Sequence, residues 1–409
     1  MELTRRTLAH ARAGTVPLAG EVGRVPARNY YAPDRWQAEM DRVFKRLPLV
    51  LGFSCEFAKP NSYKAMEIAG VPVLLTKPGD GPVQGFVNMC SHRGAIIVPD
   101  GTGTARRFTC PYHAWSYDAD GALVGILDRD EFGEIDESCH GLTPLPVAER
   151  SGIVFGRLTP DTESNNAELD LDTFLCGYGD LLDHHGFADC TFVGSQSVEG
   201  PNWKVAYDGY LDFYHLPILH KDTFGPDYSN KAIYDAWGPH QRVTSPDQRM
   251  LALDGMPESE WPTDLLTAGV WTIFPHTSIA GFRIGDSDAE GEDGEGGRMY
   301  MVSTLFPGAD PDTSVTVQNF LAAFDPPESL RPTIAGQQEF LLRVVRDEDY
   351  FTGNRIQRSV KTGAKTEFLF GRNEAGGQRF HGWVDRLVAA ETDEDVAGLF
   401  EQAEVVFQR

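Results

Sequence analysis

The chain has few basic residues for its acidity. Its 409 residues include 36 lysines and arginines against 60 aspartates and glutamates, so its formal charge is −24. Such a charge repels phosphate backbones and anionic lipid surfaces, and we therefore expect neither nucleic acid nor a membrane as a partner. No apolar run approaches the ~20 residues that span a bilayer, and residues 1–6 lack the apolar core of a secretion signal. These absences predict a soluble, cytoplasmic protein.

Cysteine is also scarce, with six residues in the whole chain. Four of them show no paired spacing and are expected to be buried free thiols in a reducing compartment, namely Cys55, Cys139, Cys176 and Cys190. The sequence has neither a Gly-x-Gly-x-x-Gly motif after a predicted strand nor the four-cysteine pattern of plant-type ferredoxins. We therefore expect no flavin or nicotinamide module within it.

The other two cysteines belong to a pair of matching motifs. Cys90-Ser-His92 and Cys110-Pro-Tyr-His113 each supply one thiolate and one imidazole. Zinc-finger halves usually combine cysteine with cysteine and histidine with histidine. The mixed halves favour a [2Fe–2S] cluster, in which two thiolates bind one iron and two imidazoles bind the other. A zinc ion held by the same four side chains is the alternative.

The length of the chain predicts two domains. Residues 1–45 are expected to form an arm and a helix, Asp34 to Phe44, that packs on the larger domain. Residues 46–158 contain short β-like runs broken by glycine and proline, and should form a small antiparallel β domain that holds the cluster. A polar segment from Thr159 to Leu171 marks the boundary, so that residues 159–409 form the second domain.

The second domain is predicted to combine strands with a long helix. Strand-like runs occur at Val270–Ile279, Met299–Leu305 and Ser314–Ala323, and a helical pattern runs from about Glu328 to Ile356. This order predicts an α+β fold with the helix laid across an antiparallel sheet. Residues 285–297 carry six carboxylates; we expect a solvated hairpin loop there, with a calcium site as the alternative.

A second metal site is indicated by Asp212, His215 and His220. On a helix near Trp203 to Tyr214, Asp212 and His215 would share one face, whereas a histidine five positions further would point elsewhere. Pro217 removes a helical hydrogen bond and can return His220 to the same side. Two imidazoles and one carboxylate form the non-haem iron(II) triad, which leaves coordination positions open.

The carboxylate of this triad is sought in the long predicted helix. An apolar stripe follows the helical repeat through Ile334, Leu341, Val345, Thr352 and Ile356. Asp349 falls on this stripe, whereas Asp347 and Glu348 should point away from it. A carboxylate on a buried face is costly unless it is paired or binds a metal. Periodicity therefore selects Asp349, with a capping or salt-bridging role as the alternative.

These motifs together resemble those of the catalytic alpha subunits of Rieske non-haem iron ring-hydroxylating oxygenases. The resemblance rests on both Cys/His pairs, Asn202-Trp203-Lys204, Asp212-x-x-His215-x₄-His220, Glu348-Asp349 followed by Gln357, and Phe370-Gly371-Arg372-Asn373-Glu374. It implies a Rieske [2Fe–2S] cluster on Cys90, His92, Cys110 and His113, and mononuclear Fe(II) on His215, His220 and Asp349. At Asp208-Gly209 many relatives have Glu-Asn, and Gly209 offers no side chain beside the iron.

The resemblance also implies an architecture and an activity. The expected fold is a small antiparallel β Rieske domain plus a helix-grip (START/SRPBCC-like) catalytic domain with a pocket under the long helix. Such proteins use O₂ and electrons that come from NAD(P)H through a separate reductase or ferredoxin to hydroxylate an apolar substrate, often in the catabolism of aromatic hydrocarbons. Monooxygenation of an alicyclic substrate and oxidative demethylation are alternative outcomes. A Rieske electron-transfer protein and a ligand-binding protein with structural metals are rival classes.

The implied assembly is a head-to-tail homotrimer, with or without a beta subunit, in which the cluster of one subunit faces the iron of the next. Asp212 is then expected to carry electrons between the metal centres, because its carboxylate can accept a hydrogen bond from His215 and reach a cluster histidine across the interface. Arg93, Arg106 and Arg107 are expected near the exposed edge of the cluster, where they would attract an acidic electron donor.

A substrate pocket is expected beside the proposed iron helix and on the predicted strands. Its candidate residues are Leu216, Ile218, Trp271, Phe274, His276, Phe282 and Met301. The apolar members would suit a hydrophobic substrate, although packing in the core is the alternative for them. His276 is the polar member expected to orient a substrate.

Overall fold

The computed structural model describes residues 2–160, 168–225, 229–262, 268–285 and 296–408. The chain divides into two compact units, one formed by Met1–Val43 together with Asp172–Arg409 and the other by Phe44–Leu171. The smaller unit is therefore an insertion in the sequence of the larger one. The acidic segment for which a hairpin loop or a calcium site was predicted lies at 286–295, outside the described residues.

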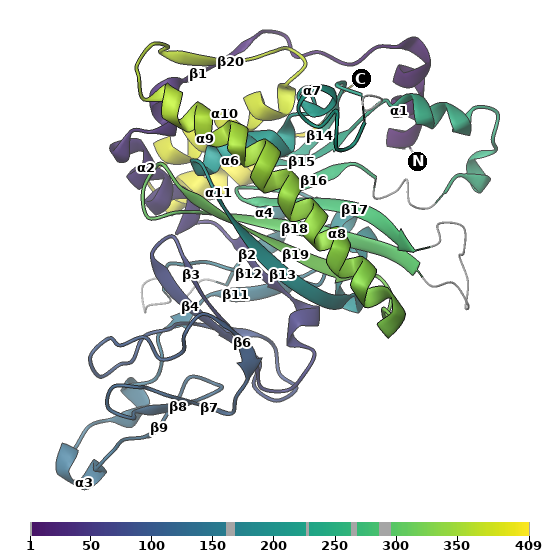
Figure 1. Cartoon of the computed structure of the whole chain (residues 1–409). Coiled ribbons are helices and arrows are strands. Elements are labelled where there is room, and N and C mark those ends of the chain that lie inside the picture. The colour runs from purple at the N-terminus through teal and green to yellow at the C-terminus, as the bar shows by residue number, and fades with distance from the viewer. Residues whose placement is uncertain (1, 161–167, 226–228, 263–267, 286–295, 409) are drawn as a thin grey trace. The chain divides into compact units, whose positions relative to one another are not determined.

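The smaller unit consists of three antiparallel sheets (Figure 1). Its strands are β2 (Leu49–Phe53), β3 (Ser62–Ile68), β4 (Val71–Thr76), β5 (Gln84–Val87), β6 (Gly101–Thr104), β7 (Arg107–Thr109), β8 (Ser116–Asp118), β9 (Leu123–Gly125), β10 (Pro144–Leu145), β11 (Val147–Arg150) and β12 (Ile153–Gly156). They form sheets in the orders β10-β5-β4-β3-β6, β11-β12-β2 and β7-β8-β9. Cys90, Cys110 and Trp115 lie in one hydrophobic core of this unit. The predicted small antiparallel β unit is confirmed.

The larger unit contains one eight-stranded antiparallel sheet. Its strands are β13 (Thr191–Gly200), β14 (Ile233–Trp237), β15 (His240–Thr244), β16 (Val270–Ile273), β17 (Thr277–Gly285), β18 (Gly296–Pro307), β19 (Ser314–Ala322) and β21 (Val405–Phe407). They are ordered β13-β19-β18-β17-β16-β15-β14-β21. This sheet supplies one wall of the site described below.

Helices cover one face of this sheet, and Figure 1 shows α8 (Arg331–Val344) lying across β17, β18 and β19. Ile334 of α8 packs in a core with Met299 of β18 and Phe320 of β19, which explains the apolar stripe of the helix. A π-helical turn, Val345–Asp349, joins α8 to α9 (Tyr350–Val360). Helices α6 (Trp203–Leu211), α7 (Leu216–Leu219) and α10 (Ala375–Ala389) complete the cover. The predicted α+β arrangement is therefore confirmed.

The N-terminal segment is an integral part of the larger unit. It contains α1 (Glu2–Ala13), α2 (Pro33–Glu39) and β1 (Gly23–Pro26), which pairs with β20 (Glu367–Phe370). Glu39 of α2 is fully buried and forms ion pairs with Arg35 and Lys204, while Trp203 donates a hydrogen bond of 2.8 Å to it. Such a buried charge is tolerated because each of its oxygens has a partner.

Two predicted elements differ from the structure, and two strands were not predicted. The run Val270–Ile279 is two strands, β16 and β17, separated by a turn that contains Pro275. The helix expected to reach Tyr214 ends at Leu211. Strands β14 and β15 were not predicted, because residues along both strands are buried and the apolar–polar alternation of a half-exposed strand is absent. None of the helices in the described parts of the chain has the length and hydropathy to cross a bilayer.

Candidate metal centres

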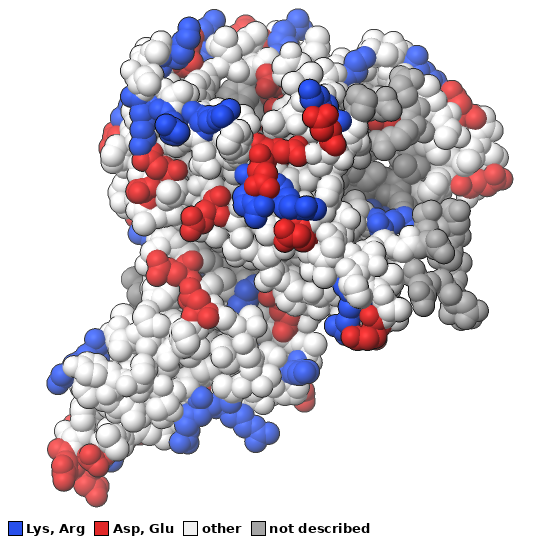
Figure 2. Space-filling model, viewed as in Figure 1, with Lys and Arg blue, Asp and Glu red and all other residues white. Residues whose placement is uncertain are grey.

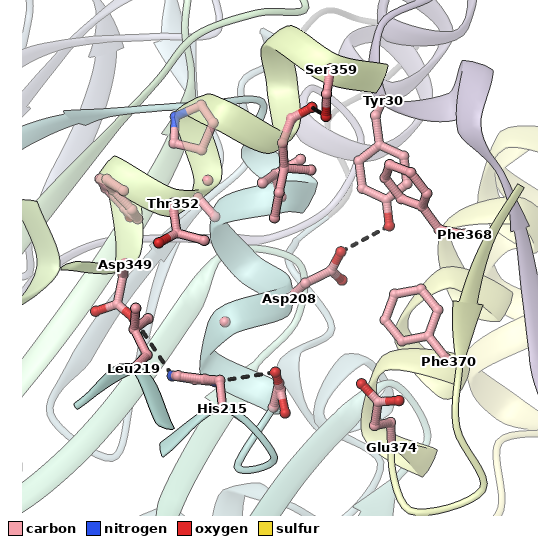
Figure 3. A pocket seen from close by; sticks show the side chains of 18 of the residues that line it. Tyr30, Asp208, His215, Leu219, Asp349, Thr352, Ser359, Phe368, Phe370 and Glu374 are labelled. Atoms are coloured by element: carbon pink, nitrogen blue, oxygen red, sulfur yellow. Dashed lines mark hydrogen bonds and ion pairs between the residues drawn. The ribbon is translucent and has the colours of Figure 1, made fainter. Parts of the chain in front are cut away.

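His215, His220 and Asp349 converge in the larger unit. Their ligand-type atoms lie within 4.8 Å of one another. The Nε2 atoms of the two histidines are 3.2 Å apart, and Asp349 Oδ1 lies 3.2 Å from His220 Nε2 and 3.6 Å from His215 Nε2. Figure 3 shows the Asp349 and His215 side chains pointing toward each other from different elements. The three residues selected from sequence are thus brought together in the structure.

A break in the helix places the two histidines. Helix α6 ends at Leu211, and Asp212 adopts an extended conformation in which its Oδ1 accepts a hydrogen bond of 2.5 Å from the Tyr214 amide. His215 then precedes the short helix α7, where Pro217 occupies the first turn and has no intrahelical donor to lose. The proline therefore starts a second helix and does not bend the first. His220, at the end of α7, turns back toward His215.

The π-helical turn places Asp349 and its neighbour. The wider turn changes the register that a regular α-helix would have, and such turns are frequent at functional sites. Asp349 and Glu348 both face the histidines, while Asp347 pairs with Arg346 at the surface. The prediction that Glu348 points away was therefore wrong, because it assumed an uninterrupted α-helical repeat.

Carboxylates hold the outer nitrogen of each histidine. Asp212 Oδ2 lies 3.1 Å from His215 Nδ1, and Glu348 Oε2 lies 2.6 Å from His220 Nδ1. Thr223 donates a hydrogen bond to the other oxygen of Glu348. Both Nδ1 atoms can then carry the proton, which directs each Nε2 lone pair to the centre of the site. Neither Glu348 nor Thr223 was predicted from the sequence to hold a histidine, although Glu348 belongs to the Glu348-Asp349 motif that supports the resemblance.

The donor set fits a divalent metal ion. Two neutral imidazole nitrogens and one carboxylate oxygen are the ligands of the non-haem Fe(II) triad. Burial lowers the pKa of His220, but the adjacent carboxylates of Asp349 and Glu348 outweigh burial and shift the pKa upward. The same negative charges that favour a proton there also favour a bound cation.

An inner cavity of ≈ 160 Å³ opens on this site. All three candidate ligands line it, with Leu216 and Phe224 on the α7 side. Its other walls are formed by Tyr210, Phe213, Val270, Ser278, Ala280, Met301, Leu341, Val344, Val345 and Tyr350. No lysine or arginine lines the described part of the cavity. It suits a small, neutral and largely apolar molecule.

Two of the seven predicted pocket residues line the inner cavity, namely Leu216 and Met301. Ile218 is 75% exposed and lies outside it. Trp271 follows Val270 on β16, so its side chain projects to the opposite face of the sheet, where it contacts Tyr178 and His185.

The remaining three predicted residues also lie away from the cavity. Phe274 packs on Phe380 in the core. Phe282 points to the same face as Ser278 but lies further along β17, where it packs against the core under α8. His276 is buried beside Phe306, and burial lowers its pKa to about 3. Its predicted role in orienting a substrate has no support from this position.

An outer cavity of ≈ 470 Å³ lies on the other side of His215 and Asp349 (Figure 3). Asp212, Asp208 and Glu374 line it. Aromatic rings of Tyr30, Phe368 and Phe370 form another part of its wall. Burial raises the pKa of Glu374. Carboxylates thus surround the outer side of the His215–Asp212 pair.

Of the two residues that depart from the family motif, Asp208 lines the outer cavity and Gly209 lines both. Asp208 Oδ2 accepts a hydrogen bond of 2.8 Å from Tyr30, and its Oδ1 lies 2.9 Å from His381 Nε2. Gly209 lines both cavities, and a Cβ atom added there would meet nothing within 4 Å. The structure therefore has open space where many relatives carry a side chain.

The second centre lies in the two Cys/His loops of the smaller unit. Each loop is closed by backbone hydrogen bonds, from the Cys90 amide to Ala95 (2.9 Å) and from the Cys110 amide to Trp115 (2.8 Å). Gly94 in the first loop and Ala114 in the second have positive φ angles of 75° and 55°. Only glycine adopts this conformation without strain, so the turn at Ala114 is held by the surrounding loop.

The four candidate cluster ligands are arranged with thiols inside and imidazoles outside. Cys90 and Cys110 are each 2% exposed, whereas the rings of His92 and His113 are half-buried with centroids 4.7 Å apart. His92 Nδ1 is buried and has no hydrogen-bond partner among the described residues. Burial and the neighbouring His113 lower the pKa of His92. A neutral imidazole with a free buried nitrogen fits a metal ligand.

Two aromatic residues support this centre. Trp115 stacks on His92 with ring centroids 5.0 Å apart. The Tyr117 hydroxyl lies 3.3 Å from Cys90 Sγ and accepts a hydrogen bond of 2.9 Å from the Ser91 amide. Burial and the contact with Cys90 raise the pKa of Tyr117 to about 12, so this phenol is a donor at neutral pH. Neither residue was selected from the sequence, although Trp115 and Tyr117 follow His113 closely.

Comparison with known sequences agrees with these two centres. A family model for the ring hydroxylating alpha subunit (catalytic domain) matches residues 187–284 and 295–390, and one for the Rieske [2Fe-2S] domain matches residues 48–135. The chain belongs to the Rieske ring-hydroxylating oxygenase alpha subunits. The donor sets of both centres fit the cofactors that this family implies, a Rieske [2Fe–2S] cluster and a mononuclear iron.

Individual relatives differ in the reactions that their names state. The benzene 1,2-dioxygenase alpha subunit of Pseudomonas putida is 32% identical over 313 residues, which are 70% of this chain and 64% of that protein. The glycine betaine monooxygenase oxygenase subunit of Chromohalobacter salexigens is 28% identical over 200 residues, covering 48% of this chain and 43% of that subunit. The chain thus spans under two thirds of the length of these relatives.

A solved structure shares the fold of the whole chain. Naphthalene 1,2-dioxygenase from Rhodococcus sp., bound to indole, matches with a TM-score of 0.71 and 20% identity over 95% of this chain and 98% of that one. At this identity the match supports the architecture alone.

Proposed function

We propose that the protein is the terminal oxygenase of a multicomponent Rieske non-haem iron system that hydroxylates a small apolar substrate. One observation carries this proposal: the inner cavity, which has no lysine or arginine in its described lining, opens directly on the convergent His215, His220 and Asp349. When bound at the two centres, the cluster and Fe(II) would supply stored electrons and the activation of O₂.

The chain's own residues would position the reactants. Asp212 and Glu348 hold the Nδ1 protons of His215 and His220, so both imidazoles present the same nitrogen to the metal. The apolar wall from Val270, Met301 and Leu341 excludes water and places a substrate carbon beside the triad. Addition of both oxygen atoms to a ring consumes O₂, two electrons and two protons; insertion of one oxygen consumes the same and releases water.

Aromatic dihydroxylation is the outcome we favour, because the rings of Tyr210, Phe213 and Phe224 line a cavity whose described lining has no lysine or arginine. Monooxygenation of an alicyclic molecule or oxidative demethylation is the second candidate, since the relatives include monooxygenases. A Rieske protein that only transfers electrons would not need the triad or the inner cavity.

Electrons would come from NAD(P)H through a separate reductase or ferredoxin. Arg93, Arg106 and Arg107 are exposed on the smaller unit, and Figure 2 shows basic side chains gathered beside β7. We propose that this surface attracts an acidic donor by charge complementarity. The assembly that we propose is a homotrimer in which the cluster of one subunit approaches Asp212 of the next, with or without a beta subunit.

The proposed function is tested by metal content and product mass. We expect three irons per chain after anaerobic reconstitution, of which two are labile-sulfide iron. Incubation of the reduced protein with ¹⁸O₂ and a panel of neutral aromatic and alicyclic compounds should give a product with one or two labelled oxygens. Two irons per chain and no labelled product with any compound would indicate an electron carrier.

A further inference from the structure

A row of polar side chains crosses the buried face of the eight-stranded sheet. Direct cross-strand pairing connects Gln196 of β13 with Gln318 of β19, Gln318 with Ser303 of β18, and Ser303 with Ser278 of β17. The row continues through Thr272 of β16 to Gln241 of β15. Ser278, Ser303 and Gln318 are all at most 4% exposed. Polar side chains in consecutive paired positions of a hydrophobic face are costly unless they find partners.

The hydrogen bonds along this row are incomplete at its centre. Gln196 donates a hydrogen bond of 2.8 Å to Gln318 Oε1, which fixes the amide of Gln318 on its β13 side. Gln318 Nε2 is buried and has no partner among the described residues. Each such buried donor is normally satisfied by water or by a ligand.

The row reaches the inner cavity at Ser278. Ser278 lines the cavity wall, and its neighbours along the same face, Val270 of β16 and Ala280 of β17, are apolar. The Ser278 hydroxyl makes no hydrogen bond to another residue in the described part of the chain. It is therefore a polar group presented to a ligand on an otherwise apolar strand surface.

We propose that Ser278 forms a polar subsite for one neutral oxygen acceptor of the substrate, a carbonyl, ether or hydroxyl oxygen. Ser303 is the cross-strand neighbour of Ser278, and Gln318 is the cross-strand neighbour of Ser303, so the polar row reaches the cavity wall at Ser278. With no protein partner recorded for its hydroxyl among the described residues, Ser278 is available to donate to a ligand in the cavity. A substrate held by its oxygen at Ser278 presents its apolar carbons to the triad on the other wall of the cavity. The subsite rests on the proposed function, because it selects among the substrates of that same cavity.

The chemistry of the row distinguishes this acceptor from charged ligands. The described lining has no lysine or arginine to bind a carboxylate, and its carboxylates, Asp212 and Asp349, lie beside the histidines and not beside Ser278. An anionic substrate would lose its hydration without gaining a lysine or arginine as a partner. The substrate class is thus a small apolar ring with one uncharged oxygen substituent.

The test compares two ligands of the same shape, acetophenone and ethylbenzene. Their dissociation constants would be measured by calorimetry with the anaerobic holoenzyme, and their products would be analysed after reduction in the presence of O₂. Ser278→Ala removes the proposed donor. Thr277→Val is the matched control, because Thr277 is also a buried β17 residue but points to the opposite face of the sheet.

We expect Ser278→Ala to lower the ratio of the ethylbenzene Kd to the acetophenone Kd by roughly three- to tenfold, and Thr277→Val to leave the ratio unchanged. Unchanged cluster absorbance and circular dichroism would show that both variants fold. An unchanged ratio in Ser278→Ala overturns the subsite, as does the absence of saturable binding of both ligands. If labelled product forms but the Kd ratio is unchanged, the oxygenase function is supported and the subsite is not. If the Kd ratio shifts but no compound gives product, the subsite is supported and the oxygenase function is not.

Discussion

Glu348 Oε2 lies 2.6 Å from Nδ1 of His220, so the residue directly before the candidate ligand Asp349 holds another candidate ligand in place. We predict that Glu348→Ala weakens iron binding at the mononuclear site by roughly 10- to 100-fold, because the His220 imidazole loses the partner that fixes its orientation. Iron content after dialysis against a series of chelator concentrations measures this change.

Asp347→Ala is the matched control for Glu348→Ala. Asp347 is the preceding residue of the same π-helical turn, but its side chain is 55% exposed and pairs with Arg346. The Asp347→Ala variant should therefore bind iron at the mononuclear site with the affinity of the unchanged protein. Equal iron loss in both variants would mean that the turn itself is disturbed and that Glu348 does not act through His220.

The sequence allowed Asp349 to be selected but not Glu348, and the reason is physical. Asp349 lies on the apolar stripe of a regular helix, so periodicity identifies it without knowledge of the fold. The π-helical turn at Val345–Asp349 places Glu348 on the face that points to the histidines. The local sequence does not predict that turn. The two Cys/His loops, in contrast, could be located from spacing alone.

The cavity could be predicted only in part. A strand alternates its faces, so Trp271 and Val270 cannot both line one pocket, but the sequence does not say which face is concave. The predicted residues were chosen for size and apolarity, and most large apolar side chains of this unit are in its core. Smaller residues that line the cavity, such as Ser278 and Ala280, could not be selected by size and apolarity.

A second prediction concerns Asp212, whose Oδ2 lies 3.1 Å from His215 Nδ1 on the wall shared with the outer cavity. If this carboxylate connects the centres of neighbouring subunits, Asp212→Ala should retain the visible spectrum of the cluster and most of the mononuclear iron while losing nearly all turnover. Stopped-flow oxidation of the reduced cluster by O₂ and substrate measures the connection directly. Iron loss in proportion to activity, with the rate restored by added ferrous iron, would show that Asp212 only orients His215.

The reduction potential of the cluster provides a third prediction. None of the six cysteines forms a disulfide, although only Cys190 of the four predicted as buried thiols is buried. No disulfide therefore joins the ligand loops, and a potential in the lower part of the Rieske range of roughly −150 to +300 mV is expected. The Tyr117 hydroxyl lies 3.3 Å from Cys90 Sγ, where its hydrogen bond would stabilise a reduced cluster held by that thiolate. Tyr117→Phe should therefore lower the potential by some tens of millivolts, on the order of one hydrogen bond.

Spectroelectrochemical titration of both proteins would measure this difference. Tyr63→Phe serves as the control, because Tyr63 lies on β3 and contacts Phe108 in the same unit but has no recorded contact with a cluster ligand among the described residues. A potential near the upper end of the range, or no change in Tyr117→Phe, would contradict the prediction.

Donor docking is the subject of a fourth prediction. If the exposed Arg107 helps to attract an acidic ferredoxin or reductase, Arg107→Glu should slow cluster reduction at low salt, and the difference from the unchanged protein should shrink as salt screens the charges. Stopped-flow reduction rates at several ionic strengths measure this effect. Reduction rates that do not depend on salt in either protein would exclude electrostatic docking at this surface.

The fifth prediction concerns acid stability. His240 is fully buried, its Nε2 donates a hydrogen bond of 2.7 Å to the Phe174 carbonyl, and its Nδ1 accepts one of 3.2 Å from the Phe274 amide. Burial lowers its pKa to about 4. Below pH ~6.5, therefore, this histidine is protonated in the unfolded chain but stays neutral in the folded chain until the pH approaches 4. The stability from this group is therefore complete above pH ~6.5 and declines as pH falls toward 4.

When the pH is lowered from 7.5 to 5.5, the titration of His240 should reduce the unfolding free energy of the larger unit by about 1.4 kcal/mol. His240→Gln should be less stable at pH 7.5 but should lose about 1.4 kcal/mol less over the same interval. Urea unfolding followed by tryptophan fluorescence at the two pH values tests this. The same pH dependence in both proteins would show that His240 does not titrate on unfolding.

The insertion of residues 44–171 within the larger unit has a consequence for synthesis on the ribosome. The smaller unit is complete once residue 171 has emerged, whereas β1 cannot pair until β20 at Glu367–Phe370 has been made, and Tyr30 cannot meet His381 before that residue appears. Strand β1 must therefore wait, unpaired, for more than half of translation. The Cys/His loops of the smaller unit can fold during that interval, before the inner cavity of the larger unit exists.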